Sequence, residues 1–179
     1  MLQSPVGCRP ASAGAARGAA LALLCVLLLS GCNAVGSAMG AVGGWFKSEP
    51  RPVSVAWRSL AVSATDDANQ NSPVAVDIVF VSAPAVLEAL LAMPAQRWFA
   101  TRSDLRRSFP EAVSVISLEI VPRQSVLIDP RQLAVHRALA VIVYADYVSP
   151  GDHRARLSTQ AAGYLLQMGG KGFAAVEAR

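Results

Sequence analysis

The chain has 179 residues, of which 53% are hydrophobic and 16% are charged, and its formal net charge is +4. This length suits one ordinary domain, or one domain with a processing segment. The apolar fraction is at or above that of typical soluble domains and the charged fraction is below it, so the composition excludes disorder throughout the chain.

The N-terminus accounts for much of the apolar excess. Arg9 and Arg17 precede an uninterrupted apolar run at residues 19–29, and residues 1–31 contain no acidic side chain. A basic stretch followed by a run of this length is typical of a secretory signal peptide, and the run is too short to cross a bilayer. We therefore expect residues 1–31 to be a signal peptide rather than a buried core helix.

Removal of this segment changes the charge and the cysteine count. Residues 32–179 carry a net charge of +2, so the basic character that would favour a nucleic-acid partner is largely gone. Cys8 and Cys25 lie in the removed part and leave Cys32 as the one remaining cysteine. No disulfide and no metal–thiolate site is therefore expected in the remaining chain.

Residues 32–52 are expected to form a tether. They are rich in glycine, contain two prolines and show no periodic pattern, which is typical of a linker. Trp45 and Phe46 interrupt this composition. They fit a position at lipid headgroups and a position against the domain equally well.

A β-rich domain is predicted from residue 53 to the end of the chain. Apolar and polar residues alternate over residues 53–62, which favours one strand with a bulge near Arg58. Residues 65–73 are dense in turn-forming residues and are predicted to be a loop. Residues 74–81 are nearly all apolar, which is typical of a central strand, and Asp77 is expected on a part of its face that is open to solvent.

Residues 84–109 change to a helical period. Pro84 suits the first turn of a helix that Pro94 ends, and a second helix at residues 95–109 places Trp98 on its apolar stripe. Four arginines occupy the other faces of this helix. We interpret them as a solvated face rather than a phosphate or headgroup site; they are Arg97, Arg102, Arg106 and Arg107.

Strand patterns return after Pro110. They cover residues 112–121, 125–128, 139–148, 154–168 and 173–176, and short turns separate them. Six to eight strands with short connections and one helical insertion predict an antiparallel β-sandwich.

The sequence offers little support for catalysis. His136 and His153 are isolated, so we interpret both as surface histidines, and no nucleophile or phosphate-binding motif is present. Glu119 and Asp129 lie ten residues apart across a turn. Nothing in the sequence indicates that they meet, so no catalytic carboxylate pair is predicted. We therefore expect no active site and no metal site, and the loop 65–73 is either a recognition loop or a solvated connection.

The residues that follow the apolar run, Leu29-Ser30-Gly31-Cys32, resemble the lipobox of bacterial lipoproteins. The resemblance implies that Cys32 becomes the first residue after cleavage and carries a diacylglycerol and an N-acyl chain. Asn33 follows in place of an aspartate, which implies sorting to the periplasmic face of the outer membrane.

The mature chain is also similar to the TssJ (SciN) family of type VI secretion lipoproteins. The similarity rests on the order of the lipobox, a Gly-rich tether, an Asp/Asn-rich loop closed by Ser72-Pro73-Val74, the strand VDIVFV, the segment VPRQS and the strand AVIVYADY. It implies a transthyretin-like β-sandwich with a small helical addition. It also implies an outer-membrane anchor for the secretion complex that binds the periplasmic domain of the inner-membrane TssM protein, with no cofactor, nucleic acid or small-molecule substrate.

The loop between the first two strands is the partner site that this family implies. Its residues here are Thr65, Asp66, Asp67, Asn69, Gln70, Asn71 and Ser72. Two departures from the family pattern are Asp66-Asp67-Ala68-Asn69, where an Asn followed by Pro or Asp is common, and Arg123-Gln124, where a Gly is expected. Two alternative functions remain open: a pilotin-like lipoprotein, or a small periplasmic hydrolase with His136 or His153 as base.

Overall fold

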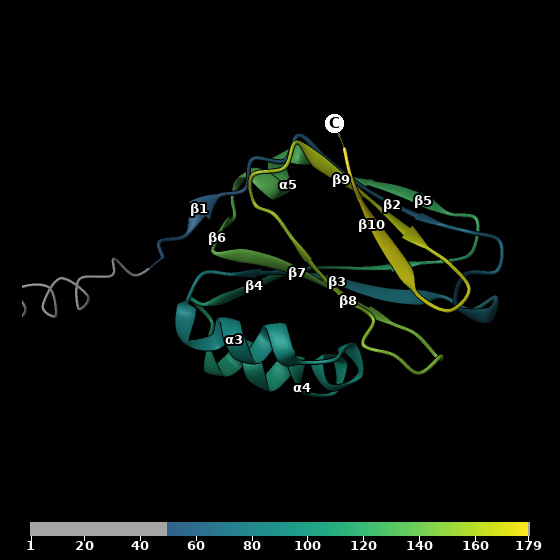
Figure 1. Ribbon diagram of the computed structural model, residues 1–179, viewed down its shortest axis with the longest axis horizontal. Helices are drawn as coiled ribbons and strands as arrows, with labels where there is room; N and C mark the ends of the chain where they lie inside the picture. Colours follow the sequence, from purple (N-terminus) through teal and green to yellow (C-terminus); the bar gives the residue numbers. More distant parts are fainter. Residues whose placement is uncertain (1–49, 179) are drawn as a thin grey trace, which may run out of the picture. The chain divides into compact units, whose positions relative to one another are not determined.

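The computed structural model describes residues 50–178. The expected signal peptide, Cys32 and the tether up to residue 49, with Trp45 and Phe46, lie outside the described residues. Residues 50–178 form one compact unit. Two four-stranded sheets and a two-stranded ribbon make up this unit, which is a β-sandwich with a helical addition, as predicted (Figure 1).

The first sheet has the strand order β10-β9-β2-β5. Its strands are β2 (Ser59–Ala64), β5 (Ser125–Ile128), β9 (Gly163–Met168) and β10 (Phe173–Glu177). β5 and β10 are the edges, and both pair antiparallel with their neighbours. The central pair, β2 and β9, is parallel, so the prediction of a wholly antiparallel sandwich is wrong at this one pair.

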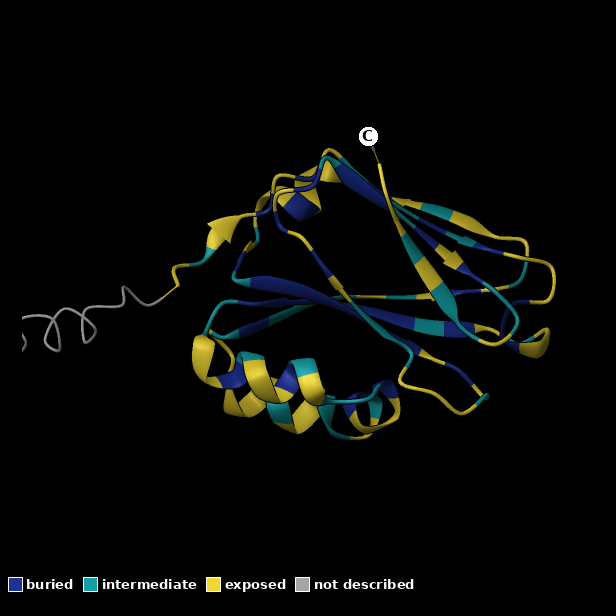
Figure 2. Cartoon of the chain, in the orientation of Figure 1, coloured by how far each residue is buried: buried dark blue, intermediate teal, exposed yellow. Residues whose placement is uncertain are grey.

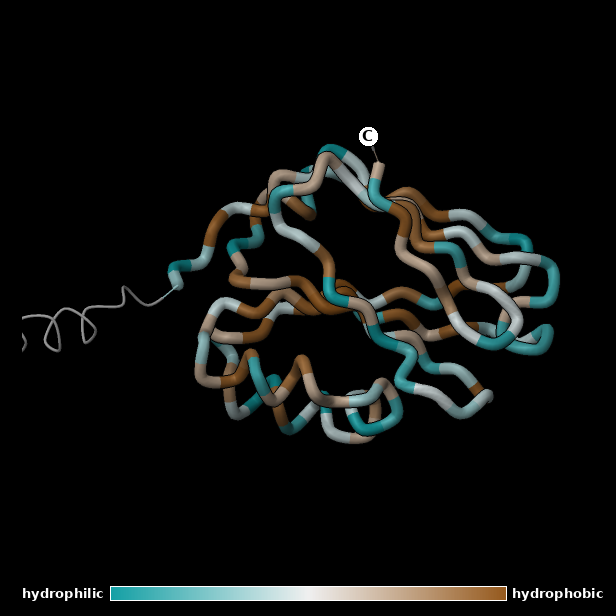
Figure 3. Tube along the Cα trace, viewed as in Figure 1, coloured by the Kyte–Doolittle hydropathy of each residue, from teal (hydrophilic) through white to brown (hydrophobic). Residues whose placement is uncertain are grey.

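The second sheet has the order β4-β3-β7-β8 and is antiparallel throughout. Its strands are β3 (Val74–Val81), β4 (Val113–Ile120), β7 (Ala140–Asp146) and β8 (Arg154–Leu157). β3 lies in the interior of the sheet, which confirms the central strand predicted from its apolar sequence. β3 and β7 of this sheet are themselves long hydrophobic segments (Figure 3).

The main core lies between the two sheets. Leu60 and Leu166 from the first sheet and Val76, Ile78 and Val143 from the second are all 0% exposed and belong to one cluster. Burial of this kind contributes about 1.5–3 kcal/mol per large aliphatic side chain. The inner faces of both sheets are therefore occupied by the core, and a binding surface has to lie on an outer face or at an end of the sandwich.

Two helices cover the outer face of the second sheet (Figures 1 and 2). α3 (Pro84–Ala92) has Pro84 in its first turn, and Pro94 precedes α4 (Ala95–Ser108); this confirms the predicted insertion. Leu90 and Trp98 pack with Val79 and Ile142 of the sheet in a second apolar cluster.

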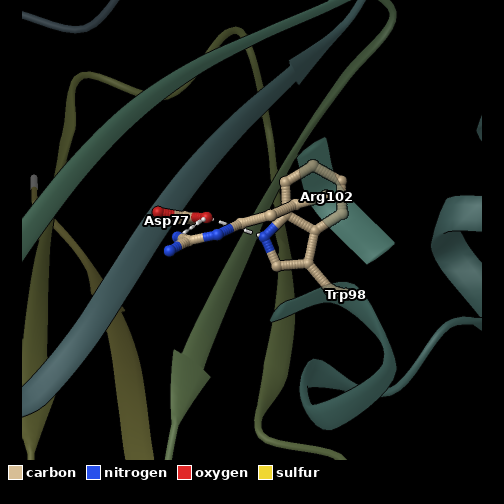
Figure 4. Close-up of polar contacts among 3 residues, drawn as sticks. All are labelled: Asp77, Trp98 and Arg102. Carbon is tan, nitrogen blue, oxygen red and sulfur yellow. Dashed lines mark hydrogen bonds and ion pairs between the residues drawn. The ribbon is translucent and has the colours of Figure 1, made fainter. Parts of the chain in front are cut away.

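Asp77 lies beneath α4, and the prediction that it faces solvent is wrong. Its carboxylate is 1% exposed. Its Oδ2 accepts hydrogen bonds from Trp98 Nε1 at 2.8 Å and from the Arg102 guanidinium at 2.7 Å (Figure 4). Arg102 is therefore not part of a purely solvated face. A buried carboxylate requires such partners. Both partners belong to α4, and the apolar pattern of β3 gives no sign of that helix.

Two of the predicted long strands are each divided between different sheets. Residues 53–62 form β1 (Val53–Ser54), which pairs with β6 (Arg137–Ala138), and then β2. Trp57 turns inward between them and donates from Nε1 to the Ser158 carbonyl oxygen at 2.7 Å. Residues 154–168 form β8 and β9. The buried positions change phase near Arg58 and near Gly163. In a sequence such a change also fits a bulge within one strand, so it does not by itself show that the chain changes sheet.

Candidate partner-binding surface

The loop 65–73 connects the two sheets. β2 of the first sheet ends at Ala64, and β3 of the second sheet begins at Val74. The middle of the loop is a single 3-10 turn, η2 (Ala68–Gln70). The loop is long because it crosses from one layer of the sandwich to the other, whereas a hairpin between neighbouring strands needs only two to five residues.

Asn69 fastens this loop to its surroundings. Its side chain is 3% exposed. Its Oδ1 accepts from the Val148 backbone nitrogen at 2.8 Å, and its Nδ2 donates to the Pro73 carbonyl oxygen at 2.9 Å. Its backbone nitrogen donates to the Gly169 carbonyl oxygen at 3.1 Å. One residue therefore ties together the loop, the end of β7 and the end of β9.

The tip of the loop has an unusual backbone. Asn69, Gln70 and Asn71 are consecutive non-glycine residues with φ of 46°, 56° and 62°. Left-handed conformations cost roughly 1–2 kcal/mol for ordinary residues, although asparagine tolerates them better. The Asn69 contacts offset this cost, and the tip presents the side chains of Gln70 and Asn71 to solvent.

The start of the loop is held by weaker, exposed contacts. Thr65 Oγ1 donates to Asp67 Oδ1 at 2.7 Å, and Asp66 forms an ion pair with Arg123 at 3.2 Å. A Cβ placed on Gly170 would lie only 2.7 Å from Asp67 Oδ2. The absence of a side chain at Gly170 thus lets the β9–β10 turn approach the loop closely.

Three other connections meet the loop at this end of the sandwich, and we call the whole set the loop end. They are the turn 121–124 between β4 and β5, the connection 147–153 between β7 and β8, and the turn 169–172 between β9 and β10. Ser149 Oγ donates to the Lys171 carbonyl oxygen at 3.0 Å, and Tyr147 Oη donates to the Gly172 carbonyl oxygen at 2.8 Å. Burial raises the pKa of Tyr147 to about 12, so this hydroxyl remains a donor at neutral pH.

The loop end combines polar and apolar exposed groups. Val148 is 71% exposed and Val121 is 46% exposed. A shallow hollow beside the loop is lined by Asn69, Ser72, Pro73, Ala75, Glu119, Asp146, Tyr147 and Val148. Glu119 and Asp146 lie opposite Ala75 on the two neighbouring strands. An apolar contact surrounded by hydrogen-bonding groups and carboxylates is suited to a protein partner.

The structure separates the seven expected site residues into two groups. Asn69 is turned into the protein. The other six are available at the surface, and five of them are exposed and one is half-buried: Thr65, Asp66, Asp67, Gln70 and Asn71, then Ser72. Val148, Glu119 and Asp146 join them at the loop end and were not predicted. Val148 ends the apolar segment 139–148, but a strand pattern does not show which loop adjoins the end of the strand.

Both histidines are more enclosed than expected. The His136 ring stacks on Phe80 with 4.0 Å between centroids, its Nδ1 lies 3.0 Å from Ser114 Oγ, and burial lowers its pKa. His153 stacks on Tyr147 at 4.8 Å, and its Nε2 lies 2.7 Å from the Ser149 carbonyl oxygen. Both side chains are half-buried rather than freely exposed, because Phe80 from β3 packs against His136 and Tyr147 from the same connection packs against His153.

Within residues 50–178, no group of three or more His, Cys, Asp or Glu side chains is arranged to hold a metal ion. In the same part of the chain, no helix has the length and apolar character needed to cross a membrane.

Comparison with known proteins identifies the fold. No protein-family model matches the sequence, and no curated protein matches it either. Among solved structures, the chain is similar to the type VI secretion lipoprotein TssJ1 from Pseudomonas aeruginosa, with a TM-score of 0.50 and 12% identity over 73% of this chain and 98% of the other. It is also similar to a chain of a type VI membrane complex, with a TM-score of 0.51 and 14% identity over 72% of this chain and 99% of the other. The fold is thus TssJ-like, as the sequence resemblance implied.

Proposed function

We propose that this chain is an outer-membrane lipoprotein of a type VI secretion system. Cys32 carries the acyl chains, and the loop end binds the periplasmic domain of a TssM-type inner-membrane protein. The TssJ-like fold and the lipobox at residues 29–32 support this proposal. The single observation that carries it is the loop 65–73, which the buried Asn69 fixes in one conformation with its polar tip exposed.

The membrane anchor follows from the chemistry of Cys32. One acyl chain gives only marginal membrane binding, whereas two or more, at about 0.8 kcal/mol per buried methylene, give stable attachment. We expect Cys32→Ser to lose labelling by a radioactive fatty acid and to leave the outer-membrane fraction. Cys25→Ser lies in the same N-terminal segment and is the control that keeps both properties. Retention of the Cys32→Ser protein in the outer membrane would contradict the proposal.

Preorganisation of the loop supports the proposed partner site. Ordering a loop on binding costs free energy, so a loop already held by internal hydrogen bonds binds more tightly for the same contacts. Asp66 and Gln70 are exposed and make no hydrogen bond to the core through their side chains in residues 50–178. They can therefore be changed without disturbing the fold.

Calorimetric titration with the TssM-type periplasmic domain of the same organism tests this site. We expect the double variant Asp66→Ala/Gln70→Ala to bind at least tenfold more weakly, because residues near the centre of an interface typically contribute most of the binding free energy. Its thermal midpoint should stay within about 2 °C. The matched control is Glu88→Ala/Gln160→Ala, which removes the same chemical groups from exposed positions on α3 and between β8 and β9. Equal affinities in the two variants would move the interface away from the loop.

We further propose that the protein binds rather than catalyses. The ring of His136 is packed against Phe80, and His153 is engaged with the Ser149 carbonyl oxygen, which does not favour either as a general base. His136→Ala and His153→Ala should leave secretion intact in cells if both variants fold. Turnover of an ester or amide substrate that either substitution abolishes would favour the hydrolase instead.

A further inference from the structure

The end of the sandwich opposite the loop end has a different surface. β3 starts beside the loop 65–73 and finishes at Val81, whose carbonyl oxygen accepts from the Leu139 backbone nitrogen at 2.7 Å. The ribbon of β1 and β6 and the short helix α5 (Pro130–Ala134) lie at this far end, where the described chain begins (Figure 1). Five exposed residues there form what we call the basic surface: Arg51, Val53, Arg131, Val135 and Arg137.

The three arginines of the basic surface are not neutralised by ion pairs within the described residues. Within residues 50–178 none of them forms an ion pair with a carboxylate. Arg137 donates to the Pro52 carbonyl oxygen at 2.9 Å and to Ser54 Oγ at 3.4 Å, which are neutral acceptors. In residues 50–178, the acidic residue nearest in sequence to Arg131 and Arg137 is Asp129, whose Oδ1 accepts from the Arg131 backbone nitrogen and caps α5. Glu49, two residues before Arg51 in the sequence, is a second carboxylate, and two carboxylates against three guanidinium groups leave a small positive excess.

Apolar side chains lie among these arginines. Val135 is 76% exposed and Val53 is 41% exposed. Figure 2 shows β1 as exposed at the start of the described chain. A single exposed valine is common on protein surfaces. Exposed apolar side chains together with arginine side chains are typical of surfaces that bind the interface of an anionic membrane.

The loop end has the opposite charge. Glu119 and Asp146 flank Ala75 there, Asp67 is exposed, and Arg123 is already paired with Asp66. The two ends therefore differ in the sign of their excess charge. A negatively charged surface attracts one end and repels the other, within about a Debye length of 8–10 Å.

We infer that the basic surface rests on an anionic lipid surface and directs the loop end away from the membrane. The position of this contact rests on the membrane anchor proposed above. Seventeen residues, 33–49, separate Cys32 from Pro50. Fully extended, they span at most about 60 Å. This tether keeps the basic surface near the lipid, so a weak attraction is enough to orient the domain. Lipid is favoured over an acidic protein because the segment that leads to Cys32 leaves the domain next to this surface.

Vesicle binding by the isolated domain tests the inference. Both apolar clusters lie entirely within residues 50–178, so a fragment of residues 49–179 contains the complete core and keeps Glu49. The fragment carries an acetylated N-terminus, which avoids an added positive charge at its first residue. We expect it to sediment with vesicles of equal parts phosphatidylglycerol and phosphatidylcholine at 20 mM salt, to be released at 500 mM salt, and not to sediment with phosphatidylcholine alone.

Charge-neutralising variants locate the contact. Arg51→Gln/Arg131→Gln should lower the partition coefficient by about tenfold or more, because each basic residue near an anionic surface changes binding roughly fivefold. The matched control Arg97→Gln/Arg156→Gln removes two charges from exposed positions on α4 and β8 and should change it less than twofold. Equal losses in both pairs, or no binding of the unmodified fragment to anionic vesicles, would overturn the inference. The fragment lacks Cys32 and keeps the loop unchanged, so a negative result leaves the proposed anchor and partner site standing.

Discussion

Asn69 and Asp77 are buried polar side chains that attach neighbouring segments to the second sheet in different ways. Asn69 is neutral and bonds to backbone groups of Val148 and Pro73. Asp77 is a carboxylate that bonds to the side chains of Trp98 and Arg102. Bonds to the backbone fix the path of the chain, whereas bonds to side chains reinforce a helix that an apolar cluster already holds in place.

The comparison teaches that stability and binding can be separated in this molecule. Changes around Asp77 should alter the free energy of unfolding and leave the loop end intact. Changes at Asn69 should alter both, because the exposed tip of the loop depends on it. Four substitutions test this separation.

Trp98→Ala should have the largest effect. Trp98 is 0% exposed, stacks on Tyr144 with 4.9 Å between ring centroids and donates to Asp77. Removing a buried aromatic side chain costs about 3–5 kcal/mol, and urea denaturation would measure the loss. Trp98→Phe is the control that keeps most of the packing without the Nε1 donor, and it should lose less. Partner affinity of the folded Trp98→Ala protein should equal that of the unmodified chain.

Asn69→Ala should cost about 2 kcal/mol, because it leaves the partly buried Val148 nitrogen and Pro73 carbonyl oxygen without their partner. It should also weaken TssM-type binding about tenfold, since the freed tip has to be ordered again on binding. Asn71→Ala is the matched control for stability, because Asn71 has the same left-handed backbone but an exposed side chain. An Asn69→Ala protein with normal affinity would show that the tip conformation does not matter for the partner.

Asp77→Asn should cost about 1–2 kcal/mol. The amide oxygen still accepts one hydrogen bond, but the charge-assisted bond to Arg102 is lost, and Arg102 is 39% exposed and regains solvent. Chemical denaturation of Asp77→Asn, Arg102→Gln and the double variant would measure the coupling between the two side chains. Additive losses would mean that the ion pair itself contributes nothing.

Asp66→Ala should have the smallest effect, below about 0.5 kcal/mol, because both side chains of the Asp66–Arg123 pair are about three-quarters exposed. Thermal denaturation at low and high salt would measure it. A loss above 1 kcal/mol would show that this pair holds the start of the loop more firmly than its exposure indicates.

Much of the fold could be predicted from the sequence because its signals are local. The continuous apolar run of β3 indicated an interior strand, and Pro84 and Pro94 bounded α3. The remaining features depend on residues far apart in the chain. Burial of Asp77 requires Arg102 from a helix, and the division of residues 53–62 between β1 and β2 requires the distant partners β6 and β9.

The candidate site divides in the same way. Its position followed from turn-forming residues between two strands, and the composition of residues 65–73 is sufficient for that. The inward direction of Asn69 could not be predicted, because its partners include Val148 and Gly169, which only the assembled sandwich brings to the loop.

The parallel pair β2–β9 has a consequence for how the chain folds. Leu60 lies opposite Tyr164, more than a hundred residues later in the sequence, so the centre of the first sheet cannot form until almost the whole chain is available. Contacts of such long sequence separation slow folding. A chain that ends before β9 leaves β2 with β5 as its one remaining partner in the sheet. The first sheet is therefore complete only after the C-terminal hairpin of β9 and β10 has been made.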